Sequence, residues 1–436
     1  MTGSETRKPR PARVASSRWA AEVSQPNSSA TSVTPQSGRV RSKASSTRSA
    51  RSTVCRAPAG VRRSRSNAVI VISPFRPELH IAGNHCAQRY PIPNVASAPR
   101  PALFPVERRA GVRIRREAPM LKYVLDIVEL LDDPQVTGKA VVGYLDAAAG
   151  AEGSSAQVTT VMGDQGSTDF VLVRIPGSRG RASGGDARTL GVVGRLGGIG
   201  ARPEVTGLVS DADGATAAIA TAAKLLDMRR RGDVLPGDVV VATHICPSAP
   251  TEPHDPVPFM GSPVDIATMN RHEVTADMEA VLSIDTTKGN RIINHKGLAL
   301  SPTVKEGWVL RVAEPLGELL AVVTGEPLVT YPVTTQDITP YGNGVHHINS
   351  ILQPATATAA PVVGLAVTSA AAVPGCQTGA SHESDIASAA RYAVEVAKGF
   401  GAGSLDFHDP VEFDNLVHRY GSLAHLQTLG RTTQEV

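Results

Sequence analysis

The chain has 436 residues, of which 41% are hydrophobic and 19% are charged, and its formal net charge is +4. Its four cysteines show neither CxxC spacing nor the density of a disulfide scaffold, so a reducing cytoplasm is the expected compartment. From residue 120 onward no segment is long and apolar enough to cross a membrane. These properties exclude a small disulfide-rich domain and favour a globular cytoplasmic protein.

Charge divides the chain into two unlike parts. Residues 1–119 contain 20 Arg, 2 Lys, 5 Glu and no Asp, a net charge of +17, whereas residues 120–436 carry −13. The first part is rich in Ser, Arg, Pro and Ala and has no helical or strand period, so we expect a disordered extension. Such a tail could bind nucleic acid or an acidic membrane, or act as a transit peptide, but its aromatic residues are sparse.

The position of the methionines favours a plainer interpretation of this extension. No methionine lies between Met1 and Met120, and an amphipathic pattern begins at Met120. We therefore interpret residues 1–119 as upstream sequence from an overextended gene start, and we expect neither a nucleic-acid partner nor a membrane partner. The remaining 317 residues suffice for one large α/β domain or two smaller ones.

From Met120 the hydrophobic pattern alternates between the periods of helices and strands. The first helix begins there, and the Asp-Asp-Pro that follows Leu131 stops it. An alanine-rich helix follows Asp211 and ends at Gly232, and a last helix starts at Ser384, its expected N-cap. Apolar strand-like runs occupy residues 158–162, 170–175, 189–193, 207–210, 238–243, 280–284 and 361–368.

Strand, loop and helix in alternation predict an α/β fold with a mainly parallel sheet covered by helices on both faces. This domain is expected over residues 120–403. Residues 404–436 are expected to form a C-terminal appendage.

Side chains suited to acid–base chemistry or metal binding repeatedly follow the apolar runs. Asp211 follows residues 207–210, Asp285 follows residues 280–284, and His382 stands in the loop after the last strand. Because the carboxyl ends of parallel strands meet at one edge of a sheet, we expect the three side chains to converge there. Taken singly, Asp285 is better explained as a loop-capping residue and His382 as a hydrogen-bonded surface histidine.

The sequence Thr-His-Ile-Cys places His244 and Cys246 on one side of a strand end. As chemistry, the two residues are a soft-metal pair or a Cys/His nucleophile arrangement. As structure, they are a packed strand terminus with a buried, inert thiol. Both interpretations stay open at this point.

Three familiar site types find no support in the sequence. The glycine-rich GRLGGIG at 194–200 does not match G-x-G-x-x-G, and Pro203 disfavours a helix there. Neither GxSxG nor HExxH occurs. A nucleotide-binding fingerprint, a serine α/β-hydrolase and a zincin therefore lack their defining residues.

Long and unusual strings fill the region from Met120 to about Phe400. They are GRLGGIGARPE, VSDADGA, GDVLPGDVVVATHICPSAPT, PHDPVPFMGSPVD, LSIDTTKGNRIINHKG, SPTVKEG, TTQDITPYGNG, NSILQPATAT and PGCQTGASHESDI. With these strings the region closely resembles an uncharacterised prokaryotic family, domain of unknown function 1177. That resemblance implies a bacterial protein but no activity.

The order of these segments is also similar to that of the co-catalytic zinc aminopeptidases of the tetrahedral and deblocking type. Strand ends in those peptidases supply a His-x-Asp pair, a bridging Asp, a Glu-Glu pair, a further Asp and a terminal His. Asp211, Asp285 and His382 match the bridging Asp, the further Asp and the terminal His. The resemblance implies an aminopeptidase-like fold.

The chain departs from the peptidase pattern at both paired motifs. Arg195 and Gly197 stand where the His-x-Asp pair is expected, and His244, Ile245 and Cys246 stand in place of the Glu-Glu pair. Without those residues one metal site and the usual base are lost, which leaves at most a mononuclear site.

With these departures, the resemblance implies a divalent metal, most simply zinc. Its expected ligands are Asp211 or Asp213, His244, Asp285 and His382. Glu383 adjoins a ligand and is the expected base, ahead of Glu252, His254 and Asp255 in nearby loops. Arg195 or Lys288 is expected to hold a substrate carboxylate.

Two classes of function follow. The first is a metal-dependent hydrolase of a small amide or peptide-like molecule. The second is a non-catalytic protein that keeps the fold to bind a small metabolite. Chemistry dependent on Cys246 ranks below both, and a homo-oligomer is left open.

Overall fold

The computed structural model describes residues 118–164, 166–195, 207–247, 249–334 and 347–428. The predicted disordered extension lies outside the described residues except for its last two positions. The helices are α1 (Met120–Leu131), α2 (Gly138–Ala149), α3 (Asp213–Arg230), α4 (Ile266–Glu273), α5 (Glu314–Thr324), α6 (Glu383–Ala402) and α7 (Pro410–Tyr420). The strands are β1 (Ser155–Gly163), β2 (Gly166–Ile175), β3 (Leu190–Arg195), β4 (Val239–Ile245), β5 (Thr251–Glu252), β6 (Phe259–Met260), β7 (Ala280–Thr286), β8 (Gly297–Leu300), β9 (Val304–Lys305), β10 (Trp308–Val309) and β11 (Val362–Thr368).

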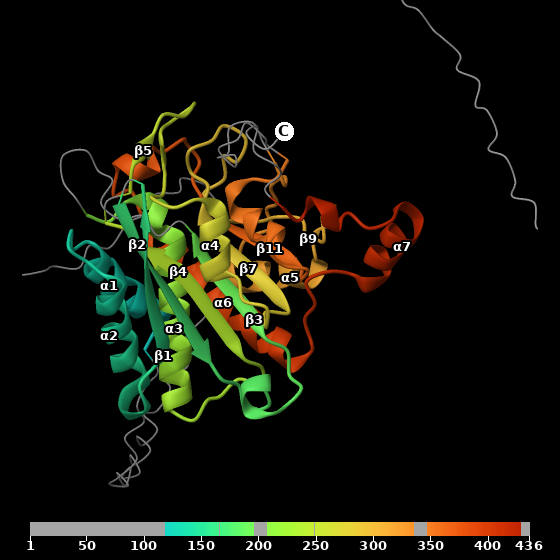
Figure 1. Cartoon of the computed structure of the whole chain (residues 1–436), viewed down its shortest axis with the longest axis horizontal. Helices are drawn as coiled ribbons and strands as arrows, with labels where there is room; N and C mark the ends of the chain where they lie inside the picture. The colour runs from blue at the N-terminus through green and yellow to red at the C-terminus, as the bar shows by residue number, and fades with distance from the viewer. Residues whose placement is uncertain (1–117, 165, 196–206, 248, 335–346, 429–436) are drawn as a thin grey trace, which may run out of the picture. The chain divides into compact units, whose positions relative to one another are not determined.

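The predicted α/β fold is confirmed, and it is built on a single large sheet (Figure 1). Within the described residues this sheet has nine strands in the order β1-β2-β4-β3-β7-β11-β9-β10, with β8 also paired to β11. The strands β4, β3, β7 and β11 run parallel at its centre. Antiparallel pairs flank them on both sides, so the expected parallel strands form the centre of the sheet and its outer strands are antiparallel.

The parallel centre follows directly from the sequence. Strands β3, β4 and β11 are buried at every position, because their near-continuous runs of Val, Ala, Gly and Leu offer no polar face to water. The antiparallel edge has a different local cause. Strands β1 and β2 pair in register up to Gly163 and Gly166, and a connection this short permits only an antiparallel hairpin.

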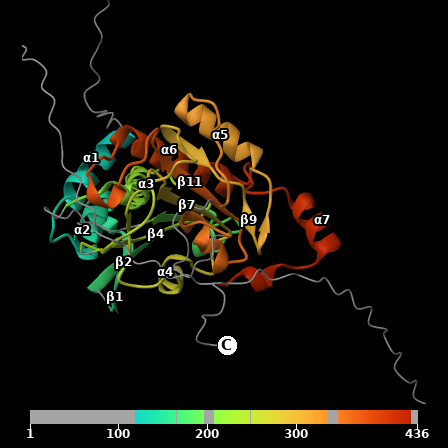
Figure 2. The same ribbon diagram turned by 90° about the horizontal axis from the view of Figure 1, so that it is seen from above.

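Helices cover the two faces of the sheet unequally (Figure 2). On one face α3 lies against the central strands, α1, α2 and α6 pack against α3, and α5 packs against α6. Helix α3 is rich in alanine and almost entirely buried. On the other face α4 and the 3₁₀-helix η4 (Ser350–Thr356) enclose a second apolar cluster that includes Tyr331, Ile351 and Leu352.

Several local expectations differ from the structure. Residues 207–209 form no strand, and a 3₁₀-helix (η3) begins at Ser210. Helix α6 begins at Glu383 with His382 as N-cap rather than Ser384, because the His382 carbonyl already accepts the backbone N–H groups of Asp385 and Ile386. Helix α2 was not foreseen from the sequence, which suggested no element between the first helix and the strand at 158–162.

The region after Gly403 contains α7, which lies beside the β9–β10 edge in both views (Figures 1 and 2). Trp308 of β10 contacts the Tyr420 ring and donates a hydrogen bond to the Gly421 carbonyl at 3.3 Å. Asp409 caps the start of α7 by accepting the Val411 N–H. The short edge strands are therefore partly covered by the C-terminal region.

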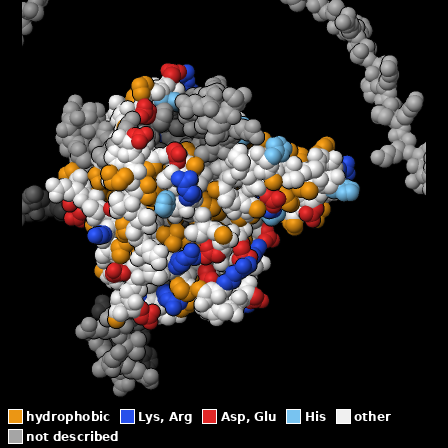
Figure 3. All heavy atoms as spheres, in the orientation of Figure 1, with side chains coloured by type: hydrophobic (Ala, Val, Ile, Leu, Met, Phe, Trp, Pro, Cys, Tyr) orange, Lys and Arg blue, Asp and Glu red, His pale blue; other side chains and the backbone are white. Residues whose placement is uncertain are grey.

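Acidic and basic side chains are interspersed on the face shown in Figure 3. One surface ion pair of the protein joins Arg181 to Glu279 at 2.7 Å. Among the described residues no helix is both long enough and apolar enough to span a bilayer.

Candidate functional site

Three ionisable side chains stand near the carboxyl ends of adjacent parallel strands. Arg195 ends β3, Asp285 lies one residue before the end of β7, and these two residues are paired in register. His244 lies at the equivalent end of β4. Each strand has a valine two or four positions earlier, Val193, Val240 or Val281, that belongs to the cluster under η4. Strand alternation therefore puts all three side chains on that face.

The start of α3 adds two carboxylates to this edge. Asp211 lies in η3 and Asp213 is the first residue of α3. A Cβ on Gly214 would lie 2.1 Å from the Arg195 carbonyl oxygen and 2.4 Å from that of Ile284. Only glycine permits this approach, and the VSDADG segment therefore brings its aspartates up against the ends of β3 and β7.

Asp211 and Asp285 are electrostatically linked. Burial of the Asp211 carboxyl group, followed by the neighbouring charge of Asp213, raises its pKa to about 7. Burial also raises the pKa of Asp285 well above its ordinary value, and the charge of Asp211 raises it further. The Thr286 N–H at 2.7 Å and the Ser350 hydroxyl at 3.4 Å offset only part of this cost. Both shifts favour the protonated forms of these two carboxyl groups.

The close packing of Asp211 depends on one glycine. A Cβ on Gly375 would lie 1.9 Å from Asp211 Oδ1. The pKa of the neighbouring Cys376 thiol is also raised, first by burial and then by the Asp211 charge. The PGCQTG segment therefore forms one wall around the Asp211 carboxylate.

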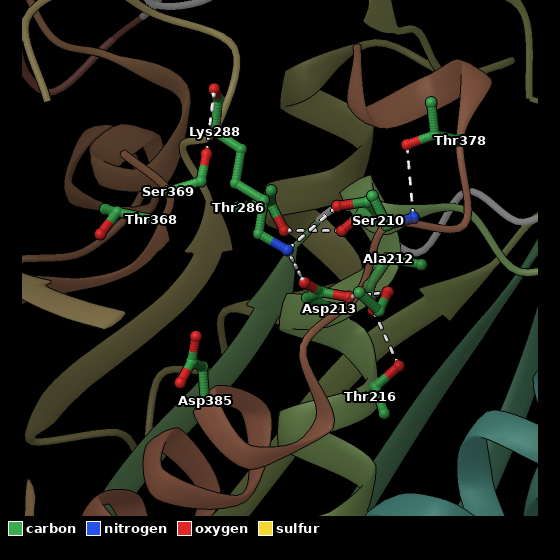
Figure 4. A network of polar contacts seen from close by, with 12 residues as sticks. Ser210, Ala212, Asp213, Thr216, Thr286, Lys288, Thr368, Ser369, Thr378 and Asp385 are labelled. Carbon is green, nitrogen blue, oxygen red and sulfur yellow. Dashed lines mark hydrogen bonds and ion pairs between the residues drawn. The ribbon is translucent and has the colours of Figure 1, made fainter. Parts of the chain in front are cut away.

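Lys288 is held inside the protein by Asp213 (Figure 4). Its ammonium group forms a short ion pair with Asp213 Oδ2 and donates a second hydrogen bond to Ser210 Oγ at 3.0 Å. Ser381, on the loop before α6, donates to the other oxygen of Asp213. Both Lys288 and Asp213 are essentially inaccessible to solvent. Because its ammonium group is already bound by the protein, Lys288 does not suit the expected role of holding a substrate carboxylate.

A second buried network surrounds Arg195. Its Nε donates to Glu273 Oε2 at 2.8 Å, and one terminal nitrogen donates to Asn270 Oδ1 at 2.6 Å. Glu273 Oε1 lies 2.6 Å from His244 Nδ1. Burial works against ionisation of Glu273, but the Arg195 charge and the contact with His244 outweigh it and lower the pKa of Glu273. The predicted ligand His244 is thus bound to a carboxylate of the protein.

Glu273 and Asn270 were missed in the sequence. Both lie on the short helix α4, where a polar pair spaced by three residues looks like an exposed face. Glu273 is 0% exposed and Asn270 is 4% exposed. The only sequence signal for such buried partners is the apolar β3 run that ends at Arg195, since a charge buried there requires a partner.

The remaining candidates lie around the start of α6. The charge of His382 lowers the pKa of Asp213, although burial raises it overall, so His382 is close to the Lys288–Asp213 pair. Its Nδ1 is buried and has no hydrogen-bond partner among the described residues. Glu383 follows it as the first residue of α6 and is partly buried.

Cys246 lies in a small apolar cluster beside the wall around Asp211. It is 1% exposed and packs with Val209, Ala249, Met260 and Cys376. Its thiol lies 3.5 Å from the Ser167 carbonyl oxygen. This environment matches the structural interpretation of the His-Ile-Cys segment, because a buried thiol in an apolar cluster is a poor nucleophile.

The expected metal ligands do not form a coordination group. In the described part of the chain no three His, Cys, Asp or Glu side chains are arranged to hold a metal ion. His244 is bound to Glu273, and both oxygens of Asp213 already accept hydrogen bonds. Asp211, Asp285 and His382 lie at the same sheet edge, but as parts of separate contacts.

Comparisons with known proteins give one family and a set of distant structures. A family model described as "Protein of unknown function (DUF1177)" matches residues 159–430. No curated protein matches the chain. Among solved structures, the bottromycin maturation enzyme BotP is 14% identical, with 64% of this chain and 70% of that one covered and a TM-score of 0.39.

Two aminopeptidases are similar at the same level. For the cytosol aminopeptidase of Coxiella burnetii the identity is 14%, the coverage 64% of this chain and 69% of that one, and the TM-score 0.39. For the leucine aminopeptidase of Caenorhabditis elegans the corresponding values are 12%, 64%, 67% and 0.35. The family expected from the sequence is confirmed by the family model, and aminopeptidases are among the similar solved structures.

Proposed function

The chain belongs to the family described as "Protein of unknown function (DUF1177)", and we propose that it hydrolyses a small amide or peptide-like substrate with Asp211 and Asp285 as its acid–base pair. One observation carries this proposal. Two carboxyl groups with raised pKa values lie near the carboxyl end of a parallel strand, Asp285 near the end of β7 and Asp211 in the adjoining η3, where ligands bind in open α/β sheets. Raised pKa values of this kind suit carboxyl groups that must exchange protons at pH 7.

The electrostatics assign different roles to the two residues. Asp211, with a pKa of about 7, is ionised in a large fraction of molecules at neutral pH and acts as the base. Its negative charge raises the pKa of Asp285, which favours the protonated form of that group, and we assign Asp285 the role of acid. One ionised and one protonated carboxyl group can activate water and polarise a carbonyl at the same time.

The proposed reaction conserves protons and electron pairs. Asp211 takes a proton from water while the water oxygen forms a bond to the amide carbon, and Asp285 gives its proton to the carbonyl oxygen. The tetrahedral intermediate then collapses: its hydroxyl proton returns to Asp285, the proton on Asp211 passes to the leaving nitrogen, and the C–N bond breaks. A carboxylic acid and an amine leave, and both aspartates regain their starting states.

A divalent metal does not fit the described donor set. The positive charges that accompany the carboxylates are those of the protein, Lys288 on Asp213 and Arg195 on Glu273. Buried cations of this kind take up the negative charge that a metal ion would neutralise. No step of the proposed reaction therefore passes through a metal, in contrast to the metal-dependent hydrolase expected from the sequence.

The test uses the full chain on a panel of amides and short peptides, with Asp211→Asn and Asp285→Asn as variants and Asp277→Asn, a surface ion-pair residue, as matched control. The kcat/KM of the wild type is expected to rise with pH through about 7, as Asp211 ionises. Each site variant is expected to lose about 10²–10⁴-fold in kcat. The control is expected to stay within about twofold.

The same panel separates the competing functions. Activity that chelation abolishes and a divalent metal restores would establish the metal-dependent alternative. Binding of small metabolites without turnover of any substrate would favour the non-catalytic protein. Loss of activity in Glu383→Gln as large as in Asp211→Asn would move the role of base to Glu383.

A further inference from the structure

We propose that Arg195 binds a carboxylate of the substrate next to the amide that is hydrolysed, so that the substrates are N-acyl amino acids or short peptides with a free carboxyl terminus. This inference rests on the proposed function. It concerns substrate recognition, whereas Asp211 and Asp285 carry the reaction.

The guanidinium of Arg195 is only partly satisfied by the protein. Nε and one terminal nitrogen donate to Glu273 and Asn270. The other terminal nitrogen, Nη1, is buried and has no hydrogen-bond partner within the described ranges, and the residue as a whole is 0% exposed. A buried charged donor left without an acceptor is costly, and a ligand oxygen would remove that cost.

The protein fixes the orientation of this guanidinium. Asn270 accepts from Arg195 through its side-chain oxygen, and its amide nitrogen donates to the Gln353 carbonyl at 3.2 Å and to Thr356 Oγ1 at 3.1 Å. Glu273 is fixed in turn by His244 at 2.6 Å. Because these partners hold the planar fork in place, little side-chain entropy remains to be lost when a ligand binds.

The charges nearby favour an anionic ligand over a neutral one. A guanidinium N–H forms its strongest hydrogen bonds with a carboxylate. The guanidinium already binds one carboxylate, that of Glu273, through Nε. Its buried Nη1, which has no partner among the described residues, can donate to a second one.

The register also limits where the carboxylate can lie on the substrate. Paired residues on neighbouring strands are about 5 Å apart, so an anion at Arg195 lies only a few bonds from an amide at Asp285. An α-carboxylate on the amine side of the amide meets this requirement. Lys288 is not an alternative, because Asp213 and Ser210 already occupy its ammonium group.

The test measures binding rather than turnover, by titration calorimetry on the full chain. The probes are N-acetyl amino acids with Gly, Leu, Phe, Asp or Lys side chains, each compared with its own carboxamide. The wild type is expected to bind the best carboxylate about tenfold or more tightly than its carboxamide. Arg195→Lys is expected to lose this preference, because an ammonium group cannot reproduce the planar, fixed N–H donors of the guanidinium. Arg174→Lys, a surface arginine, is the matched control.

A second variant tests the inference without changing Arg195, in case Arg195→Lys does not fold. Asn270→Ala keeps the charge of Arg195 but removes one of its supports, and it is expected to weaken carboxylate binding severalfold while the carboxamide is unaffected. Equal affinity of the wild type for both forms, no binding of any probe at millimolar concentration, or a preference that survives in Arg195→Lys would overturn the inference. If the preference is found and no probe is hydrolysed, the proposed function fails and the recognition site stands.

Discussion

The raised pKa of Asp211 should be measurable as a stability cost. In the unfolded chain this carboxyl group has an ordinary pKa near 3.8, whereas in the folded protein its pKa is about 7. The folded state therefore holds the proton more tightly. The stabilisation that results is fully present below pH 4 and is lost as the pH rises through 7.

The size of the effect follows from that difference. Each pKa unit corresponds to about 1.4 kcal/mol, so the rise from 3.8 to about 7 amounts to about 4 kcal/mol. Asp211→Asn removes the ionisable group and with it this loss. The variant is expected to be more stable than the wild type at pH 8 by up to about 4 kcal/mol, and nearly equal in stability at pH 4.

Urea unfolding of the full chain at several pH values between 4 and 8 tests this expectation. The wild type and Asp211→Asn are compared at each pH, with Asp277→Asn as a control for the removal of one negative charge. The difference between wild type and Asp211→Asn should grow steadily with pH, while that for the control stays flat. A difference that does not change with pH would refute the reasoning about Asp211.

Three further expectations concern the surroundings of the pair. Lys288→Met should lower the free energy of unfolding in urea by about 3–5 kcal/mol, because it leaves the charge of Asp213 buried and unpaired. The double variant Lys288→Met with Asp213→Asn should recover much of this loss. Additive losses would argue against a direct pair. Gly375→Ala should lower kcat by about tenfold or more, since its Cβ would lie 1.9 Å from a carboxylate oxygen of the acid–base pair; unchanged kinetics would mean that this wall is not needed. Thr137→Ala should cost about 1 kcal/mol through the lost cap of α2, whereas Ser384→Ala should cost less than about 0.5 kcal/mol; equal losses would restore Ser384 as the cap of α6.

The sequence predicted the centre of the fold well for a physical reason. Strands buried on both faces need uninterrupted apolar runs, and the runs at β3, β4, β7 and β11 are visible in the chain. The ends of β3 and β7 then placed Arg195 and Asp285 at one edge by topology. The antiparallel edges were less visible, because strand direction depends on connections rather than on the composition of the strand.

The partners of the site residues could not be predicted in the same way. Glu273 lies 78 positions from Arg195 along the chain, and Lys288 lies 75 positions from Asp213. Neither pair has a local periodicity, since each is formed only when α4 or the loop after β7 packs across the sheet. The departures from the aminopeptidase pattern therefore showed what was missing from the site but not which contacts replaced it.

The raised pKa values of Asp211 and Asp285 are the centre of the proposed function, and a carboxyl-carbon NMR titration of the full chain labelled with ¹³C-aspartate observes them most directly. The expected result is one resonance that titrates near pH 7 and disappears in Asp211→Asn, and a second, from Asp285, that titrates well above the ordinary range of an aspartate. If every aspartate titrated below about pH 5, in the ordinary range for this side chain, both carboxyl groups would be ionised at neutral pH and the acid–base pair would be contradicted.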